Sequence, residues 1–126
     1  MSKRKTILVA DDSSTVRKFI CFNLRMKNFD IVTAKDGLDA LQQISHRPVD
    51  LAIIDAQMPN MDGFELIKTM RNSLEYKDLP IIILGSGPSE ESIQHGAERG
   101  ADSYMVKPFN AQMIQSQIAR FLGSSE

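Results

Sequence analysis

With 126 residues, 42% of them hydrophobic and 25% charged, the chain has the size and composition of one globular domain, which we expect to span 1–126. Its 15 Lys and Arg nearly balance its 16 Asp and Glu, so the net charge of -1 gives no general attraction to nucleic acid or to an anionic membrane. A single cysteine, Cys21, excludes an internal disulfide, and no apolar stretch has the form of a signal peptide or the roughly 20 residues of a membrane span. We therefore expect a cytoplasmic protein with no membrane partner and no direct nucleic-acid partner.

Five short apolar runs alternate along the chain with five longer segments of helical periodicity. Continuous apolar runs are typical of strands that are buried on both faces of a parallel sheet, and the first, third and fourth runs have this character. The second run alternates more between apolar and polar residues, which fits an edge strand. The expected strands are Thr6–Ala10, Asp30–Ala34, Leu51–Asp55, Ile81–Leu84 and Ser103–Val106.

Each run precedes a helical segment, and four of these segments begin at a residue that is able to cap a helix. The expected capping residues are Ser13 or Ser14, Asp36, Ser89 and Asn110. The residues at helical spacing that should face the sheet are Val16, Phe19, Ile20, Asn23 and Leu24, then Leu38, Leu41 and Ile44, then Phe64, Ile67 and Met70, and finally Met113, Ile114, Ile118, Phe121 and Leu122. Cys21 lies off the first of these faces, so we expect it to be exposed and chemically inert.

Strict alternation of strands and helices in a chain of this length predicts an α/β fold, a doubly wound parallel sheet of five strands flanked by five helices. Ligands of such sheets bind beyond the carboxyl ends of the strands, near the point where the strand order reverses. Asp11 and Asp12 follow the first strand and Asp55 ends the third. Lys107 follows the fifth strand. We therefore expect three carboxylates and one ammonium group to share one small site on this rim of the sheet.

Each of these residues taken alone has a simpler explanation. Asp11 and Asp12 resemble an acidic pair at the start of a helix, and Asp55 precedes a stretch rich in turn residues. Gathered together, however, carboxylates repel one another unless a cation neutralises them, and Mg²⁺ is the hard cation that such oxygen ligands favour. Lys107, which alone is explained as a surface lysine, adds a positive charge suited to a phosphoryl oxygen. The joint placement favours a site for Mg²⁺ and a phosphoryl group.

Three segments resemble the response-regulator receiver domain, the CheY-like fold of two-component signalling: ILVADDSSTVRK (7–18), LAIIDAQMPNMDGFELI (51–67) and GADSYMVKPF (100–109). The resemblance runs from Thr6 to about Leu122. It implies a flavodoxin-like sheet with strand order 2-1-3-4-5. It also implies a protein that takes a phosphoryl group from a sensor histidine kinase or a phosphotransfer protein, and that catalyses only its own phosphorylation and dephosphorylation.

The resemblance gives each acidic residue of the expected site a role. Asp55 corresponds to the residue that accepts the phosphoryl group. Asp12 and Asp55 correspond to ligands of Mg²⁺, together with the backbone carbonyl of Gln57. Asp11 corresponds to the other residue of the acidic pair, which acts on the metal directly or through water.

The resemblance also implies roles for three residues around the acceptor. Lys107 corresponds to the lysine that pairs with the phosphoryl oxygens, and its bond to Pro108 is cis in the family. Tyr104 corresponds to the aromatic residue that changes rotamer on activation. Gly63 fits the tight loop that follows the phosphoacceptor.

At the end of the fourth strand the sequence departs from the family pattern. The family has Thr or Ser there, whose hydroxyl binds a phosphoryl oxygen and draws the next loop inward, but this chain has Gly85 followed by Ser86 and Gly87. One interpretation is that Gly85 removes the switch and leaves a weakened or constitutive receiver, since a hydrogen bond to a charged group is worth roughly 1.5–3 kcal/mol. The other is that the flexible glycines let Ser86 reach the site, although successive strand residues point in opposite directions.

Three functional hypotheses follow. The first is a stand-alone phospho-accepting receiver that binds a downstream protein through its fourth helix, fifth strand and fifth helix, around Ile93, Tyr104 and Gln117. The second is the receiver of a longer regulator that has an output domain. The third is a pseudo-receiver that never takes phosphate; Gly85 favours it mildly, and the four charged residues of the expected site argue against it.

Overall fold

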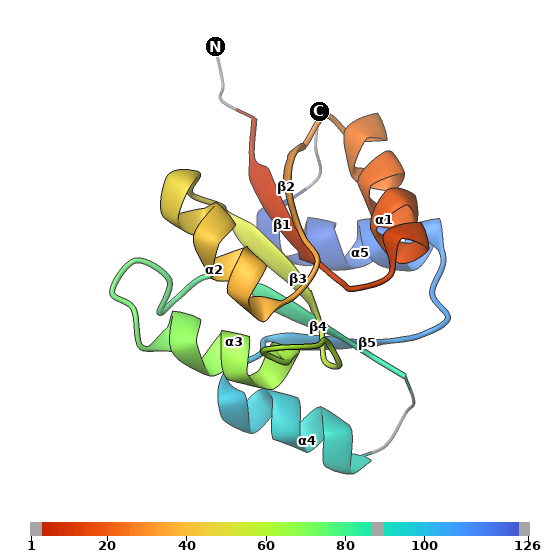
Figure 1. Cartoon of the computed structure of the whole chain (residues 1–126). Coiled ribbons are helices and arrows are strands. Elements are labelled where there is room, and N and C mark those ends of the chain that lie inside the picture. Colours follow the sequence, from red (N-terminus) through yellow and green to blue (C-terminus); the bar gives the residue numbers. More distant parts are fainter. Residues whose placement is uncertain (1–3, 87–89, 124–126) are drawn as a thin grey trace.

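The computed structural model describes residues 4–86 and 90–123, in which strands and helices alternate (Figure 1). The elements in chain order are β1 (Thr6–Ala10), α1 (Ser14–Met26), β2 (Asp30–Ala34), α2 (Gly37–His46), β3 (Leu51–Asp55), α3 (Gly63–Arg71), β4 (Ile81–Gly85), α4 (Glu90–Arg99), β5 (Ser103–Val106) and α5 (Ala111–Leu122). The strands have the expected bounds, except that β4 continues to Gly85. Among the described residues, no helix combines the length and the apolar character needed to cross a membrane.

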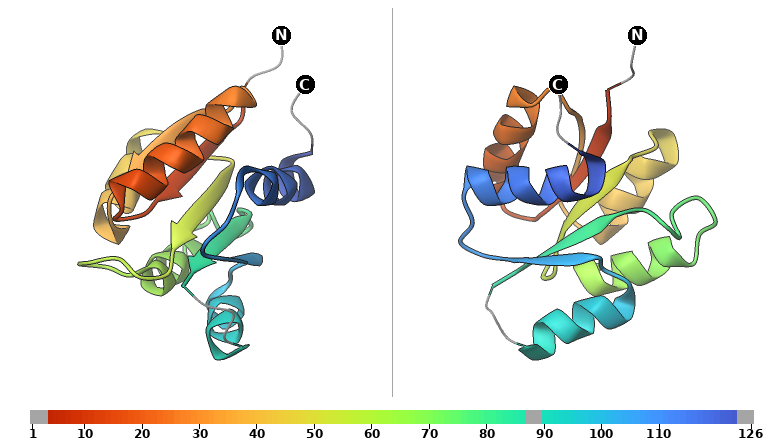
Figure 2. Two further views of the ribbon diagram at one scale, coloured as in Figure 1. Left: turned by 90° about the vertical axis from the view of Figure 1, so that its right-hand side faces the viewer. Right: turned by 180° about the vertical axis from the view of Figure 1, so that it is seen from behind.

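The five strands form one parallel sheet in the order β2-β1-β3-β4-β5, which confirms the doubly wound fold. The chain places β2 on one side of β1 and then crosses to the other side for β3, so the strand order reverses between β1 and β3. Helices α1 and α5 cover one face of the sheet, and α2, α3 and α4 cover the other (Figures 1 and 2). As its alternating pattern predicted, β2 is an edge strand.

Burial of the central strands explains their continuously apolar sequences. Every residue of β3 and β4 is buried, as are the last four residues of β1. Because neighbouring residues of a strand face opposite sides of a sheet, Ile7 and Val9 pack with residues of α1 and α5, whereas Leu8 packs with residues of α2 and α3. The sheet therefore separates two apolar layers and presents its strand ends as a fixed rim.

Side chains cap α1, α2 and α5 at the residues expected from the sequence. Ser13 Oγ, Asp36 Oδ1 and Asn110 Oδ1 each accept a hydrogen bond from the backbone N–H three residues later. Asp62 caps α3 in the same way, although it was not among the expected caps. The expected cap at Ser89 lies outside the described residues.

The expectation that Cys21 is exposed is wrong, because this residue is only 4% exposed. Helix α1 packs against both the sheet and α5, so its buried face is wider than the predicted stripe and includes Cys21. Burial also raises the pKa of the Cys21 thiol, which keeps it protonated at neutral pH. Conversely, Phe19, Leu38 and Met113 are exposed, although they were expected to face the sheet.

At the end of the sheet opposite the rim, Arg71 ties α3 to the segment that joins α4 to β5. Its guanidinium donates to the carbonyl oxygen of Gly100 through Nε at 2.9 Å and Nη2 at 2.7 Å, and it pairs with Asp102 Oδ2 at 3.0 Å. The same Asp102 oxygen accepts a hydrogen bond from the N–H of Ile81, at the start of β4. Gly100 has a φ of 108°, and a Cβ there would lie 2.8 Å from Arg71 Cγ, so this close approach requires glycine.

Candidate functional site

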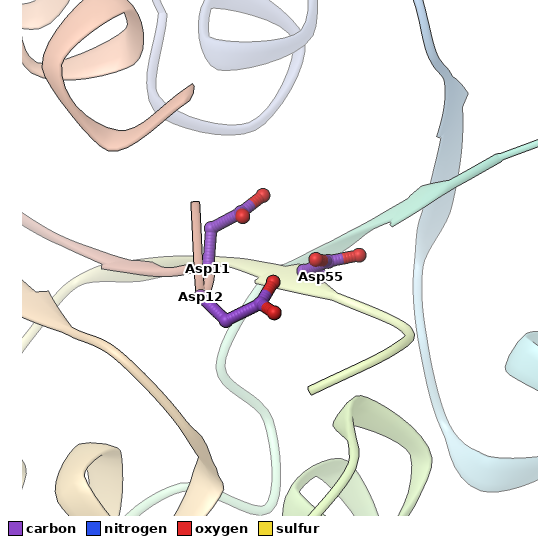
Figure 3. A group of neighbouring side chains, drawn as sticks. All are labelled: Asp11, Asp12 and Asp55. Atoms are coloured by element: carbon purple, nitrogen blue, oxygen red, sulfur yellow. The ribbon is translucent and has the colours of Figure 1, made fainter. Parts of the chain in front are cut away.

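Three carboxylates meet where β1 and β3 end. Asp11 and Asp12 follow β1, Asp55 is the last residue of β3, and one oxygen atom of each lies within 4.8 Å of the others (Figure 3). Asp11 and Asp55 are buried, and Asp12 is exposed. Since β1 and β3 are neighbours, with Ala10 paired to Ile54, the residues at their ends are necessarily close. The expected acidic cluster therefore forms where the strand order reverses.

Lys107 brings a positive charge to the same place from the end of β5. Its Nζ lies 3.3 Å from Asp11 Oδ2 and 3.3 Å from Asp55 Oδ2, so one ammonium group bridges the two buried carboxylates. The backbone N–H of Lys107 donates to the carbonyl oxygen of Gly85 at 2.7 Å, which holds the lysine against the end of β4. The bond between Lys107 and Pro108 is cis, as the resemblance implied.

The electrostatics of the cluster shift the protonation of Asp55. Burial and, after it, the charge of Asp11 raise the pKa of Asp55 to about 6, although Lys107 acts in the opposite direction. Burial alone would lower the pKa of Lys107, but the attraction of Asp55 and Asp11 outweighs it and the pKa is raised. At neutral pH the lysine is charged and Asp55 is mainly ionised, so negative charge exceeds positive charge in the site.

One buried oxygen of the cluster is incompletely satisfied. Asp11 Oδ1 accepts a hydrogen bond from the N–H of Ser13 at 2.8 Å, but Asp11 Oδ2 accepts none of good geometry from the described part of the chain. Its 3.3 Å approach to Lys107 Nζ supplies charge without a well-directed hydrogen bond. A cation or an ordered water normally satisfies such an oxygen. Three neighbouring carboxylates are a donor set that Mg²⁺ favours, so the residues present fit this ion.

The loop after β3 is folded tightly against the site. The N–H of Gln57 donates to Asp55 Oδ1 at 3.3 Å, and the N–H of Gly63 donates to the carbonyl oxygen of Ala56 at 3.0 Å. A Cβ at Gly63 would lie 2.2 Å from the backbone oxygen of Asp55, so only glycine permits this approach. The start of α3 is thereby held against the end of β3.

Asp36 and Asn60 support this loop and were not among the expected site residues. Asn60 Nδ2 donates to Asp36 Oδ2 at 2.8 Å, and the N–H of Gly37 donates to the carbonyl oxygen of Met61 at 3.1 Å. These hydrogen bonds join the start of α2 to the loop after β3. Asn60 has a φ of 68°, a left-handed conformation in which Asn is enriched, and its place in the turn sequence PNMDG was the signal that could have revealed it.

A cavity of about 320 Å³ opens over Asp55. The residues that line it are Asp12, Asp55, Ala56, Gln57, Phe64, Gly85, Ser86, Tyr104 and Lys107. Of the expected site residues, Asp11 is fully buried and is not part of this lining. Phe64 was not expected here, and its ring packs edge-on against His95 of α4 with the ring centroids 4.4 Å apart.

The family of the chain follows from a match that covers most of its length. A family model described as "Response regulator receiver domain" matches residues 7–119. The chain is a member of this family. Receiver domains belong to the response regulators of two-component systems, and phosphorylation on an aspartate and binding of Mg²⁺ at an acidic pocket are general features of the family.

Relatives and solved structures agree with this assignment. The receiver is 42% identical over 120 residues to the response regulator GtcR of Aneurinibacillus migulanus, a match that covers 92% of this chain and 48% of GtcR. It is 34% identical over 122 residues to the alkaline phosphatase synthesis transcriptional regulatory protein PhoP of Bacillus subtilis (strain 168), over 97% of this chain and 50% of PhoP. The chain thus spans about half the length of these relatives. The solved structure of the chemotaxis protein CheY4 of Vibrio cholerae is 34% identical with a TM-score of 0.91, covering 95% of this chain and 100% of CheY4.

The three residues expected to form the switch of the receiver lie together at the carboxyl end of β4, which the side chain of Tyr104 reaches from the neighbouring β5. Gly85 is buried, Ser86 is exposed, Tyr104 is partly buried, and all three line the cavity over Asp55. The tip of the Tyr104 ring lies directly beside Gly85. Gly87, which was expected to give the next loop its freedom, lies outside the described residues.

Proposed function

We propose that this receiver accepts a phosphoryl group on Asp55 from a phosphohistidine of a sensor histidine kinase or a phosphotransfer protein. The observation that carries the proposal is the setting of Asp55, which is buried, lies 3.3 Å from Lys107 Nζ and lines an open cavity at the rim. A carboxylate that accepts a phosphoryl group must be accessible to the phosphoryl donor, and the added negative charge must then be balanced by a nearby positive charge.

The chemistry needs an ionised carboxylate as the nucleophile. Because the pKa of Asp55 is about 6, the group is mainly ionised at neutral pH and available to attack phosphorus. The P–N bond to the donor histidine breaks as the bond between the Asp55 oxygen and phosphorus forms, and the leaving nitrogen keeps the electron pair. Lys107, whose Nζ lies 3.3 Å from Asp55 Oδ2, would balance the negative charge that arrives with the phosphoryl group.

Mg²⁺ fits the residues around Asp55. Asp12 and Asp55 would hold the ion together with the backbone carbonyl oxygen of Gln57, and Asp11 would act directly or through a water molecule. When bound, the ion supplies positive charge that offsets the charge of the transferring group. The exposed Asp12 and the incompletely satisfied Asp11 Oδ2 support this assignment.

We further propose that the phosphorylated receiver signals by protein–protein contact and does not turn over an independent substrate. The contact face would be formed by α4, β5 and α5. Ile93 is 41% exposed on α4, and it lines a surface hollow together with Tyr104 of β5 and Gln117 of α5. An exposed apolar residue beside a hollow supports this choice of face.

A second candidate is that this receiver controls an output domain of a longer chain. The observation in its favour is that the match covers about half of GtcR and of PhoP, and PhoP is named as a transcriptional regulatory protein. The single domain proposed for 1–126 would then be the receiver of that chain. The phosphorylation chemistry is the same in both cases, since it rests on the rim residues alone.

Phosphorylation with a small donor tests the proposal. Acetyl phosphate with Mg²⁺ should add one phosphoryl group to the receiver, detected by intact mass, and beryllofluoride with Mg²⁺ should shift amide resonances around Asp55. Asp55→Asn should show neither response. Asp78→Asn, which changes an exposed carboxylate before β4, should behave like the wild type. Labelling of Asp55→Asn would place the acceptor elsewhere, and an unmodified wild type would favour the pseudo-receiver.

A further inference from the structure

The side chain of Tyr104 fills the space beside Gly85. β4 and β5 are neighbours, with Ile83 paired to Tyr104 and Gly85 paired to Val106, so the tyrosine side chain reaches along β4 toward the rim. A Cβ built on Gly85 would lie 1.6 Å from Tyr104 Oη, 2.1 Å from Cζ and 2.8 Å from Cε1. Non-bonded atoms do not approach so closely, so the tip of the ring occupies the volume that any side chain at position 85 would need.

Gly85 provides room and is not required by an unusual backbone. Among the described glycines, a positive φ occurs at Gly100 and Gly123, whereas Gly85 is a regular residue of β4. Other residues could therefore adopt its backbone conformation, but none with a Cβ could leave Tyr104 where it is. The glycine and the position of the tyrosine require one another.

The side chain of Tyr104 lines the cavity that a phosphoryl group on Asp55 would enter. Asp55 and Lys107 line the same cavity. A phosphoryl group presents three acceptor oxygens, so it can accept hydrogen bonds from other donors besides Lys107. Oη lies about one covalent bond length from the Cβ position of residue 85. It therefore lies as near to that Cβ position as the hydroxyl of a serine or threonine would.

We propose that Tyr104 donates a hydrogen bond to a phosphoryl oxygen on Asp55, in place of the side chain that Gly85 lacks. This inference rests on the phosphorylation of Asp55 proposed above. A phenolic hydroxyl is a competent donor, and hydrogen bonds to charged oxygens are stronger than those between neutral groups. The absence of a side chain at Gly85 then leaves the space in which Tyr104 reaches the phosphoryl group, and it does not mean that the switch is lost. Ser86 is the competing donor, because it is exposed and lines the same cavity.

Tyr104 would connect the phosphoryl group directly with the outer surface. It lines the cavity over Asp55, and it also lines the surface hollow that contains Ile93 and Gln117. One side chain would thus touch both the modified residue and the face proposed to bind a downstream protein. The signal would then need no separate hydroxyl residue between the two.

Removal of single hydroxyl groups tests the proposal. Tyr104→Phe keeps the ring and loses only Oη, and Tyr76→Phe is the matched control, because the hydroxyl of Tyr76 bonds to the carbonyl oxygen of Ile44 within the core. With beryllofluoride and Mg²⁺ as the probe, fluorine and amide NMR titrations should give an apparent affinity at least about tenfold weaker for Tyr104→Phe, as expected for a lost hydrogen bond to a charged group. Tyr76→Phe should bind the probe like the wild type.

Substitutions at Gly85 give a second, independent arm. Gly85→Ala should force the ring of Tyr104 away without supplying a hydroxyl, and should weaken beryllofluoride binding about as much as Tyr104→Phe. Gly85→Thr should also displace the ring but bring its own hydroxyl, so it should restore the affinity. In the Gly85→Thr background, Tyr104→Phe should cause no further loss. Circular dichroism should be used to check that each variant is folded.

The outcomes are distinguishable. The proposal is overturned if Tyr104→Phe binds beryllofluoride as tightly as the wild type, and a loss seen only in Ser86→Ala would assign the hydrogen bond to Ser86. Failure of the proposed function looks different, because the wild-type receiver itself would not bind the probe, or Asp55→Asn would bind it equally well. Either of these two results removes both proposals together.

Discussion

The rim has a charged half near β1 and β3 and a packed half near β4 and β5, and different interactions determine the arrangement of each. At the ends of β1 and β3 the arrangement depends on charge, since one ammonium group lies 3.3 Å from each of two buried carboxylates. At the end of β4 it depends on shape, since Tyr104 of β5 fills the space that Gly85 leaves. Coulomb energy falls slowly with distance, whereas packing energy changes within a fraction of an ångström. The charged half should therefore respond to the loss of a charge, and the packed half to the gain of a single atom.

The largest effect is expected from removing a charge at the exposed edge of the acidic cluster. Asp12→Ala should weaken Mg²⁺ binding by more than about 100-fold, because even the partners of metal ligands contribute about 10- to 100-fold. Amide NMR titration with Mg²⁺ measures this. Asp12 is exposed, so the fold should be unaffected. Asp78→Ala removes the same charge from another exposed position and should leave the affinity unchanged; equal losses in the two variants would mean that net charge alone attracts the ion.

The second effect is on stability as a function of pH. The pKa of Asp55 is about 6 in the folded protein and roughly 3.9 in an unfolded chain, so the folded state binds this proton more tightly. The resulting stabilisation is present below about pH 4 and is lost as the pH rises through about 6. Without Mg²⁺, the free energy of unfolding of the wild type should fall by roughly 2 kcal/mol relative to Asp55→Asn between about pH 4 and pH 8.

Urea denaturation in the presence of a chelator, at a series of pH values, measures this difference. The comparison with Asp55→Asn cancels the other groups that titrate over the same range. Saturating Mg²⁺ should reduce the difference, because the ion offsets the excess negative charge. Parallel pH curves for the two proteins would show that burial of this carboxylate does not oppose folding.

The third effect tests the packed half. Gly85→Ala should destabilise the receiver by about 1–3 kcal/mol, because the new Cβ overlaps the ring of Tyr104. In a Tyr104→Ala background the same substitution should be neutral, or stabilising by up to about 1 kcal/mol, since the space is then empty. The four proteins form a double-mutant cycle that urea denaturation can measure. A cost that is the same in both backgrounds would show that Gly85 is needed for some reason other than Tyr104.

In the last prediction we expect no change in the affinity for Mg²⁺. It tests directly whether the charged half and the packed half of the rim are independent. Tyr104→Phe removes a neutral hydroxyl and leaves the acidic cluster as it is. Its affinity for Mg²⁺ alone should therefore stay within about twofold of the wild type, the limit within which independent sites behave additively. An affinity change larger than this would show that the packed half controls the charged half even before phosphorylation.

The charged half was predictable from the sequence to a much greater extent than the packed half. The sequence shows which charged residues stand at the ends of the strands, among them Asp11, Asp55 and Lys107. A parallel sheet brings these strand ends together whatever the details of side-chain packing. The strand bounds and the caps at Ser13, Asp36 and Asn110 depend in the same way on local pattern.

What could not be predicted depends on which side chains meet across different elements. The burial of Cys21 requires α5 to pack beside α1, and the contact between Asn60 and Asp36 joins two loops that are 24 residues apart. The position of Tyr104 depends on the register of β5 against β4 and on its rotamer. A glycine in the sequence shows that a side chain is missing, but it does not show which neighbour uses the space.

The hydrogen bonds of Arg71 have a mechanical consequence for α4. They hold the carbonyl oxygen of Gly100, the residue that directly follows α4, to the end of α3 and to the start of β5. Helix α4 has 10 residues and is therefore roughly 15 Å long, with its pinned end away from the rim. A displacement of the end of α4 nearest the rim would therefore tilt the helix about its opposite end, which Arg71 holds in place.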